Sequence, residues 1–184
     1  MVTAIKGNDT STFGGALDLG SNNLTTTGNA DVAQVITDAP AFSALLSADQ
    51  TVSTATWSKV QCNTEEVDTN SNYDNSTNYR FTPNVAGWYQ INGHICMINN
   101  TTDAAISIYK NGSSHKWGTY YSNSSGTSDR DAVVSSLVYL NGSTDYVELY
   151  GYTTGSTNKF RGLASFNPSR TYFNGFLARA VWVQ

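Results

Sequence analysis

The stretch from Tyr73 to Gly93 reads YDNSTNYRFTPNVAGWYQING, and it decides the fold class of this 184-residue chain. An Asx-rich turn is followed, from Gly87 onward, by an alternation of apolar and polar residues that continues to Met97. Because successive side chains of a strand point to opposite faces, this period of two predicts a β-strand with two different environments. We expect a core face of Tyr89, Ile91, Gly93, Ile95 and Met97, and a second face of Trp88, Gln90, Asn92, His94 and Cys96.

Further strands are predicted on the C-terminal side of this stretch. AAISIYKNG places Ile106 and Ile108 inward and ends in an Asn-Gly pair, and VVSSLVYLNG ends in a second pair at Asn141. Asn-Gly pairs favour tight hairpin turns. DYVELYGY places Val147 and Leu149 on one face. With no helical period along the chain, these short strands predict an all-β, antiparallel sandwich or jelly roll.

The composition excludes several classes of function. Charged residues make up 13% of the chain, about half of the share usual in soluble domains. The net charge is −4 with ten Lys and Arg, whereas a nucleic-acid binder needs a positive field. The start, MVTAIKGNDTS, lacks a secretory signal, and no apolar run reaches the ~20 residues of a membrane helix. We therefore expect a soluble protein that neither binds nucleic acid nor inserts into a membrane.

The two cysteines, Cys62 and Cys96, are too few for a disulfide framework and have no partners at metal spacing. Free, buried thiols are the expected state, and a single bridge between neighbouring strands is the alternative. The only histidines are His94 and His115, and no catalytic motif is present. Asp129 and Asp131, which flank Arg130, indicate a salt-bridge cluster. We therefore expect no enzyme activity.

Residues 1–39 differ in texture from residues 40–184 and form a predicted N-terminal segment. ALDLGSNNLTTTGNAD indicates two short strands, Ala16–Leu19 and Asn23–Thr27, with too few apolar residues for a core of their own. The phrase resembles the stalk segments of bacteriophage fibre proteins, which implies packing around a three-fold axis. A flexible linker is the alternative.

Residues 40–184 resemble the globular C1q domain, a jelly roll of the tumour-necrosis-factor superfamily. Six phrases carry the resemblance in order: PAFSALL, WSKVQCNTEEVDTNSNYD, FTPNVAGWYQI, YKNG, LNGSTDYVEL and FNGFLARA. The chain departs from the family pattern at Cys62 and Ile91, which stand where the family has aromatic residues, and at the inserted Ser143-Thr144. The resemblance implies a homotrimer in which one sheet of each subunit faces the axis.

We predict the trimer interface from strand faces that are too aromatic for plain solvent and too polar for a core. A solvated face with incidental tyrosines is the alternative. The predicted interface residues are Trp88, Gln90, Asn92, Tyr146, Tyr150 and Tyr152.

Residues 112–131 are interpreted as a long loop that carries aromatic and basic side chains among Ser, Asn and Asp. Loops on a rigid scaffold often carry recognition, and exposed rings suit glycan stacking. Packing of the same rings over a subunit edge is the alternative. The predicted ligand-binding residues are Trp117, Tyr120, Tyr121, Lys116 and Arg130.

The run DTNSNYD places oxygen-bearing side chains at every second position: Asp68, Asn70, Asn72 and Asp74. Calcium prefers such ligands, but Tyr73 stands where an EF-type loop needs glycine. The run is therefore a weak calcium candidate, and an Asx-rich turn is the alternative. No other cofactor is expected.

Together these features predict a bacteriophage virion surface protein, a trimeric fibre or spike with a C1q-like head that recognises or adheres to a host surface. Its expected partners are its own copies, other virion proteins through residues 1–39, and a host glycan or protein. One alternative is a capsid decoration or cement protein. A second is an extracellular C1q-like lectin or cytokine-like binding protein of a cellular organism.

Overall fold

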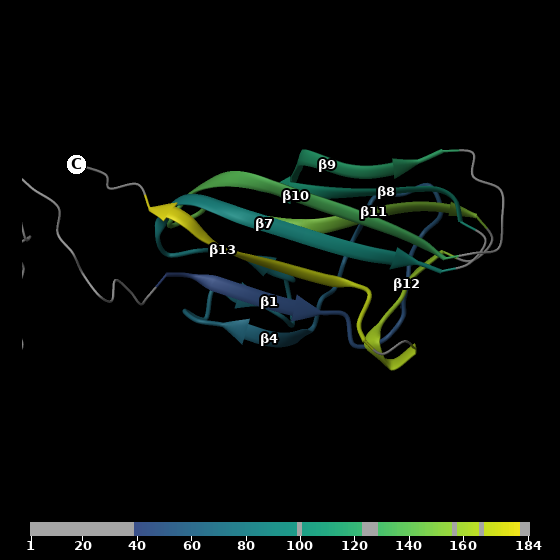
Figure 1. Cartoon of the computed structure of the whole chain (residues 1–184), viewed down its shortest axis with the longest axis horizontal. Helices are drawn as coiled ribbons and strands as arrows, with labels where there is room; N and C mark the ends of the chain where they lie inside the picture. Colours follow the sequence, from purple (N-terminus) through teal and green to yellow (C-terminus); the bar gives the residue numbers. More distant parts are fainter. Residues whose placement is uncertain (1–38, 99–100, 123–128, 156–157, 166–167, 181–184) are drawn as a thin grey trace, which may run out of the picture. The chain divides into compact units, whose positions relative to one another are not determined.

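Two antiparallel sheets make up the computed structural model, which describes residues 39–98, 101–122, 129–155, 158–165 and 168–180 (Figure 1). Residues 1–38 of the predicted N-terminal segment, residues 1–39, lie outside the described residues, and the stalk stays a prediction. The elements are β1 (Ala41–Leu45), β2 (Gln50–Thr51), β3 (Ser58–Lys59), β4 (Thr64–Asp68), β5 (Tyr73–Asp74), β6 (Arg80–Phe81), β7 (Ala86–Met97), β8 (Thr101–Lys110), β9 (Ser113–Tyr121), β10 (Arg130–Asn141), β11 (Val147–Gly155), β12 (Lys159–Phe160), the 3₁₀ turn η1 (Leu163–Ser165) and β13 (Tyr172–Ala180).

The large sheet has the order β2-β12-β7-β13-β1-β4. Strand β10 lies off this path and pairs with β7 along its whole length. The small sheet has the order β5-β6-β11-β8-β9, and β3 also pairs with β11. Every pairing among the described strands is antiparallel. The long strands β7, β10 and β13 run side by side in Figure 1. The predicted all-β antiparallel sandwich is therefore confirmed.

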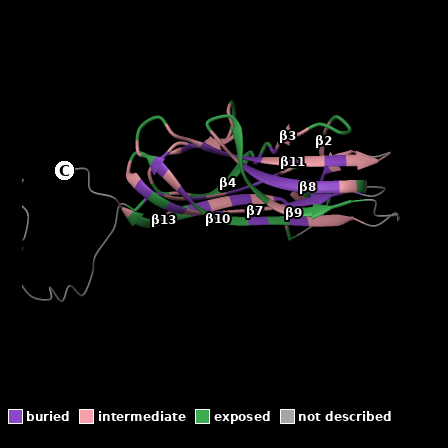
Figure 2. Cartoon of the chain, turned by 90° about the horizontal axis from the view of Figure 1, so that it is seen from above, coloured by how far each residue is buried: buried purple, intermediate pink, exposed green. Residues whose placement is uncertain are grey.

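The core lies between the two sheets and is formed by the inward residues of each strand. The predicted core face of β7 is confirmed, since Tyr89, Ile91 and Ile95 are fully buried. Figure 2 shows the same alternation of buried and more exposed residues along β7 and β10. At Gly93, an added Cβ would lie 2.4 Å from a methyl carbon of Leu149 on the opposite sheet. The two sheets therefore approach closely at this position.

Phe42 joins four distant parts of the chain into one aromatic cluster. Its ring lies 5.1 Å from that of Tyr73, 4.3 Å from that of Phe81 and 4.9 Å from that of Phe173. These residues come from β1, β5, β6 and β13, which belong to both sheets. The cluster therefore ties the two layers together.

The two Asn-Gly pairs have different roles. Asn111 and Gly112 both have positive φ, at 52° and 77°, and close the predicted hairpin between β8 and β9. Asn141 instead ends β10 in the large sheet, and residues 142–146 lead to β11 in the small sheet. The Asn141 side-chain oxygen accepts the backbone N–H groups of residues 143–145. The second pair is thus an Asx turn between sheets and not a hairpin.

Candidate interaction surfaces

The outward side chains of β10, β7 and β13 form one continuous surface, which we call the large-sheet face. Cross-strand pairing aligns these residues in rows, because Gln90 lies between Leu137 and Phe176 and Asn92 lies between Ser135 and Asn174. The face comprises Tyr139, Leu137, Ser135 and Val133 on β10, Trp88, Gln90, Asn92 and His94 on β7, and Arg179, Phe176, Asn174 and Tyr172 on β13.

One end of the large-sheet face is apolar and open to solvent. Trp88 is 45% exposed, and Leu137 and Phe176 are each 50% exposed. Tyr139 packs edge-on against Trp88, with ring centroids 5.7 Å apart. Large apolar side chains gathered on one surface indicate an interaction site, whereas single exposed ones are ordinary.

The centre of the face is a ladder of polar side chains. Gln90 Nε2 donates to Ser135 Oγ at 2.9 Å, and Ser135 Oγ donates to Asn92 Oδ1 at 2.8 Å. Asn92 Nδ2 in turn donates to Asn174 Oδ1 at 3.0 Å. This ladder satisfies much of the hydrogen-bonding capacity of the amides within the chain, so covering them would cost less than covering unpaired amides.

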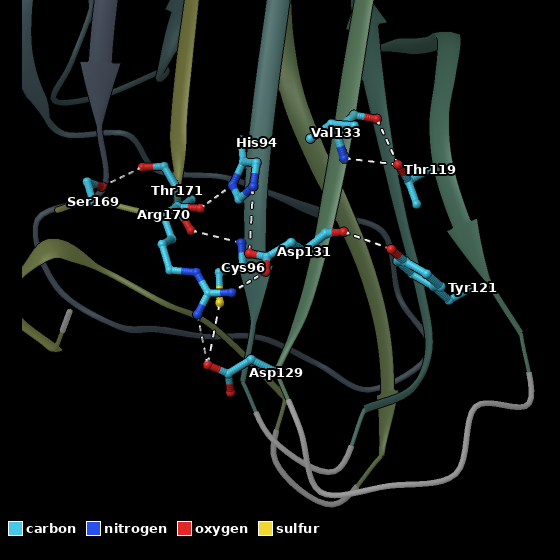
Figure 3. Close-up of polar contacts among 10 residues, drawn as sticks. All are labelled: His94, Cys96, Thr119, Tyr121, Asp129, Asp131, Val133, Ser169, Arg170 and Thr171. Carbon is cyan, nitrogen blue, oxygen red and sulfur yellow. Dashed lines mark hydrogen bonds and ion pairs between the residues drawn. The ribbon is translucent and has the colours of Figure 1, made fainter. Parts of the chain in front are cut away.

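Charged residues occupy the other end, beyond His94 (Figure 3). Asp129 pairs with Arg161 at 3.0 Å and with Arg170 at 3.4 Å, and Arg170 also pairs with Asp131. The predicted salt-bridge cluster is present, but its cations come from residues far along the chain. Arg130 instead lies over the ring of Tyr121, 6.0 Å from its centroid.

The same cluster covers Cys96. This residue lies on the predicted second face of β7 and is fully buried there. Its thiol donates to Asp129 Oδ2 at 3.7 Å, and its backbone N–H donates to the hydroxyl of Thr171. Burial raises the pKa of this thiol to about 12, so it stays protonated at neutral pH. Cys62 is also buried, and both cysteines are free, as the sequence predicted.

The predicted six-residue interface does not lie on one surface. Trp88, Gln90 and Asn92 are on the large sheet, whereas Tyr150 and Tyr152 are on β11 of the small sheet. Tyr150 stacks on Tyr109 with ring centroids 3.8 Å apart, and burial raises its pKa to about 12. Tyr146 lies beneath the guanidinium of Arg80, which is 4.2 Å from its ring centroid. Tyr146 and Tyr150 therefore pack against residues of their own chain. The predicted set divides into the β7 residues on the large sheet and Tyr150 and Tyr152, which share the outer face of β11 on the small sheet.

A second surface lies on the outer side of the small sheet. A depression of about 430 Å³, here called the small-sheet depression, is lined by Trp57, Asp103, Ala105, Trp117, Tyr120 and Tyr152. The sequence interpretation of residues 112–131 as a loop was wrong, because Ser113–Tyr121 is strand β9 and β10 begins at Arg130. Of the predicted ligand-binding residues, Trp117 and Tyr120 line the depression, and Lys116, Tyr121 and Arg130 do not.

Sequence reasoning missed two residues of this surface, Asp103 and Trp57. Trp57 precedes β3, whose residue Ser58 pairs with Gly151, and this pairing brings the Trp57 ring within 5.6 Å of that of Tyr152. Its ring also lies 5.1 Å from that of Trp117. No local pattern marks Trp57, since its role depends on the pairing of β3 with β11.

The carboxylates at the two ends of the run Asp68–Asp74 each accept backbone N–H groups, and the one at Asp74 closes an Asx turn. The Asp68 carboxylate accepts the N–H groups of Asn72 and Tyr73 at 3.0 and 2.9 Å. The Asp74 carboxylate accepts those of residues 76–78 at 2.9–3.1 Å. Within the described ranges, no three His, Cys, Asp or Glu side chains gather as a potential metal site. Calcium at this run stays a prediction from the sequence alone.

We expect Asp74→Ala to lower the free energy of unfolding by about 1 kcal/mol at pH 7, because backbone donors lose a charged acceptor. Hydrogen bonds from the N–H groups of Thr77 and Ser76 hold the pKa of Asp74 below its ordinary 3.8. A lowered native pKa stabilises the fold above pH 3.8 and loses this effect as the pH falls through the native value. Urea unfolding at several pH values should therefore show the difference shrinking below pH 3.8. Asp74→Asn is the control: it keeps an acceptor oxygen without the charge, so its loss at pH 7 should be smaller than that of Asp74→Ala, and this loss should also shrink below pH 3.8.

Comparison with known proteins finds solved structures with a similar fold. No family model matches the chain, and the search of curated proteins found no match. Many solved structures are similar. One is the globular domain of zebrafish complement 1qA, with 18% identity and a TM-score of 0.56, covering 77% of this chain and 99% of that one. Others are murine APRIL, with 6% identity and a TM-score of 0.51 (76% of this chain and 98% of that one), and the Eiger TNF of S. frugiperda, with 10% identity and a TM-score of 0.55 (79% of this chain and 94% of that one).

These likenesses confirm the fold that the six sequence phrases predict. The described residues form a jelly-roll sandwich of the C1q and TNF type. At such low identities the likeness concerns the fold alone. The described residues also contain no helix long and apolar enough to cross a membrane.

Proposed function

We propose that this chain is a self-associating recognition protein whose subunits meet through the large-sheet face. The observation that carries the proposal is the exposure of Trp88, Leu137 and Phe176 together on one sheet. Covering these side chains would remove apolar surface from water at about 25 cal/mol per Å². The resemblance to C1q domains favours three copies about an axis.

In this proposal the assembly is a bacteriophage virion surface protein that recognises or adheres to a host surface. The phrase LDLGSNNLTTTG in the N-terminal segment supports it, because it resembles fibre stalks. Residues 1–39 would attach to other virion proteins, and residues 40–184 would form a head that presents its surfaces to a host glycan or protein. The protein would act by binding and not by catalysis.

Immunogold electron microscopy tests the virion role. Antibodies raised against residues 39–184 would be applied to particles purified from lysates of cells that carry the coding sequence. Label at fibres, spikes or tail tips is the expected result. Label spread over capsid faces would instead establish the decoration alternative. If the antibody detected the protein in the lysate and marked no particle, the virion role would be refuted.

A further inference from the structure

We propose that the small-sheet depression binds a quaternary ammonium group of the choline type. This inference names the class of ligand that the proposed recognition protein would bind, and its relevance to host recognition rests on that proposed function. The binding itself is a property of the purified chain and can be tested without any particle. It is argued here from the walls of the depression, its charge and its place on the sandwich.

Four aromatic rings form the walls. Trp57 makes an edge-on contact with Trp117, with an interplanar angle of 63°, and a tilted contact with Tyr152 at 46°. Tyr120 is tilted by 56° from Trp117, with centroids 6.3 Å apart. A flat stacking platform needs rings in a common plane, whereas these neighbouring rings are inclined to one another. We call the four rings of Trp57, Trp117, Tyr120 and Tyr152 the aromatic box. Such boxes bind methylated ammonium groups, because each ring face attracts a cation.

The ring positions are held by the sheet. Trp117 Nε1 donates to Ser114 Oγ at 2.9 Å, which constrains the indole despite its 59% exposure. Trp57 also packs against Tyr109, with ring centroids 6.2 Å apart. Rings restrained before a ligand arrives lose less conformational entropy on binding. The depression is therefore largely preformed in the free chain.

The charge of the depression selects a cation. Asp103 is the single charged residue among those that line it. Its N–H donates to Thr154 Oγ1 at 2.9 Å, and that hydroxyl donates back to Asp103 Oδ2 at 3.1 Å. This reciprocal pair across β8 and β11 places a carboxylate at the edge of an aromatic box. A neutral sugar would gain little from this charge, an anion would be repelled, and an organic cation would be attracted.

The depression also remains accessible in the proposed assembly. It lies over β8, β9 and β11 of the small sheet, whereas the large-sheet face belongs to the other layer of the sandwich. The outer faces of two packed sheets point in opposite directions. Subunits that meet through the large-sheet face therefore leave the aromatic box open.

The test is a saturation-transfer difference NMR titration of the full chain with three probes at equal ionic strength. The probes are choline chloride, its neutral isostere 3,3-dimethylbutan-1-ol, and N-acetylglucosamine. Choline is expected to bind, and the neutral isostere is expected to bind about tenfold more weakly because it lacks the cation–π and Coulomb attraction. N-acetylglucosamine is expected to give no saturable signal at the concentrations at which choline does.

Three variants and a control locate the site. Trp117→Ala, Tyr120→Ala and Asp103→Asn should each weaken choline binding by about tenfold. Tyr121→Ala removes an exposed ring from the same strand, outside the depression, and should leave choline binding unchanged. Circular dichroism would confirm that each variant is folded, and Trp117 and Tyr120 are 59% and 56% exposed in the wild type, so their truncation should leave the sheet intact.

Three results would overturn the inference. Equal affinity for choline and its neutral isostere would make the depression merely apolar, and preferential binding of N-acetylglucosamine would make it a sugar site. The absence of choline binding to the folded wild type would exclude the ligand class altogether. Each of these outcomes leaves the immunogold result unaffected, so failure of this inference is distinguishable from failure of the virion role.

Discussion

An aspartate in place of Leu137 is expected to convert the proposed trimer into monomers. Leu137 is half-exposed in the single chain and lies beside Gln90 at the apolar end of the large-sheet face. If the faces of three subunits meet there, Leu137→Asp buries three like charges near one axis. Burying each unpaired charge costs several kcal/mol of association free energy. This cost exceeds the stabilisation that is lost when the leucine side chain is removed from the interface. Light scattering after size exclusion, at micromolar concentration, should give the mass of one chain.

Trp117→Asp is the matched control, because it also places a carboxylate at a large exposed side chain, but on the small sheet. This variant should keep the wild-type mass. Circular dichroism should show the wild-type strand content for both variants, since neither side chain belongs to the core. A Leu137→Asp protein that keeps the wild-type mass would show that subunits meet through a different surface.

Phe42→Ala is expected to lower the free energy of unfolding by about 3–5 kcal/mol. The Phe42 side chain is 2% exposed and contacts three aromatic rings from both sheets. Truncation would leave a cavity between the two sheets, because the remaining side chains of the core keep the sheets from closing over it. Because domains of this size have a total stability of only about 5–15 kcal/mol, urea unfolding should show a large shift of the midpoint.

Tyr120→Ala is the control for this experiment, since its ring is exposed and its loss should change the free energy of unfolding by less than about 0.5 kcal/mol. Both variants must be compared with wild type at one protein concentration, because self-association raises apparent stability by mass action. A loss of less than about 1 kcal/mol for Phe42→Ala would mean that the aromatic cluster is not central to the fold.

The features that local sequence determines were predicted correctly. The period of two along β7 identifies its core face, because alternation is a property of the strand itself. The pair Asn111-Gly112 identifies a hairpin, since its backbone adopts the positive φ that the turn requires. The fold class followed from many such local signals and from the resemblance of six phrases.

The features that depend on distant pairings could not be predicted in the same way. Tyr150 and Trp88 lie on strands with similar two-faced patterns, and only the sheet topology separates them. Asp129 has an adjacent arginine in the sequence, but its ion pairs are formed with Arg161 and Arg170, which other elements bring near. The aromatic box likewise needs Trp57 from a segment some sixty residues before Trp117.

Sedimentation equilibrium of the wild-type chain tests most directly the central claim, that the large-sheet face joins copies of the chain. At micromolar concentration the account predicts a species of three times the 19.9 kDa chain mass. A single species of 19.9 kDa over the same range of concentrations would contradict it, because Trp88, Leu137 and Phe176 would then remain exposed in the protein as it exists in solution.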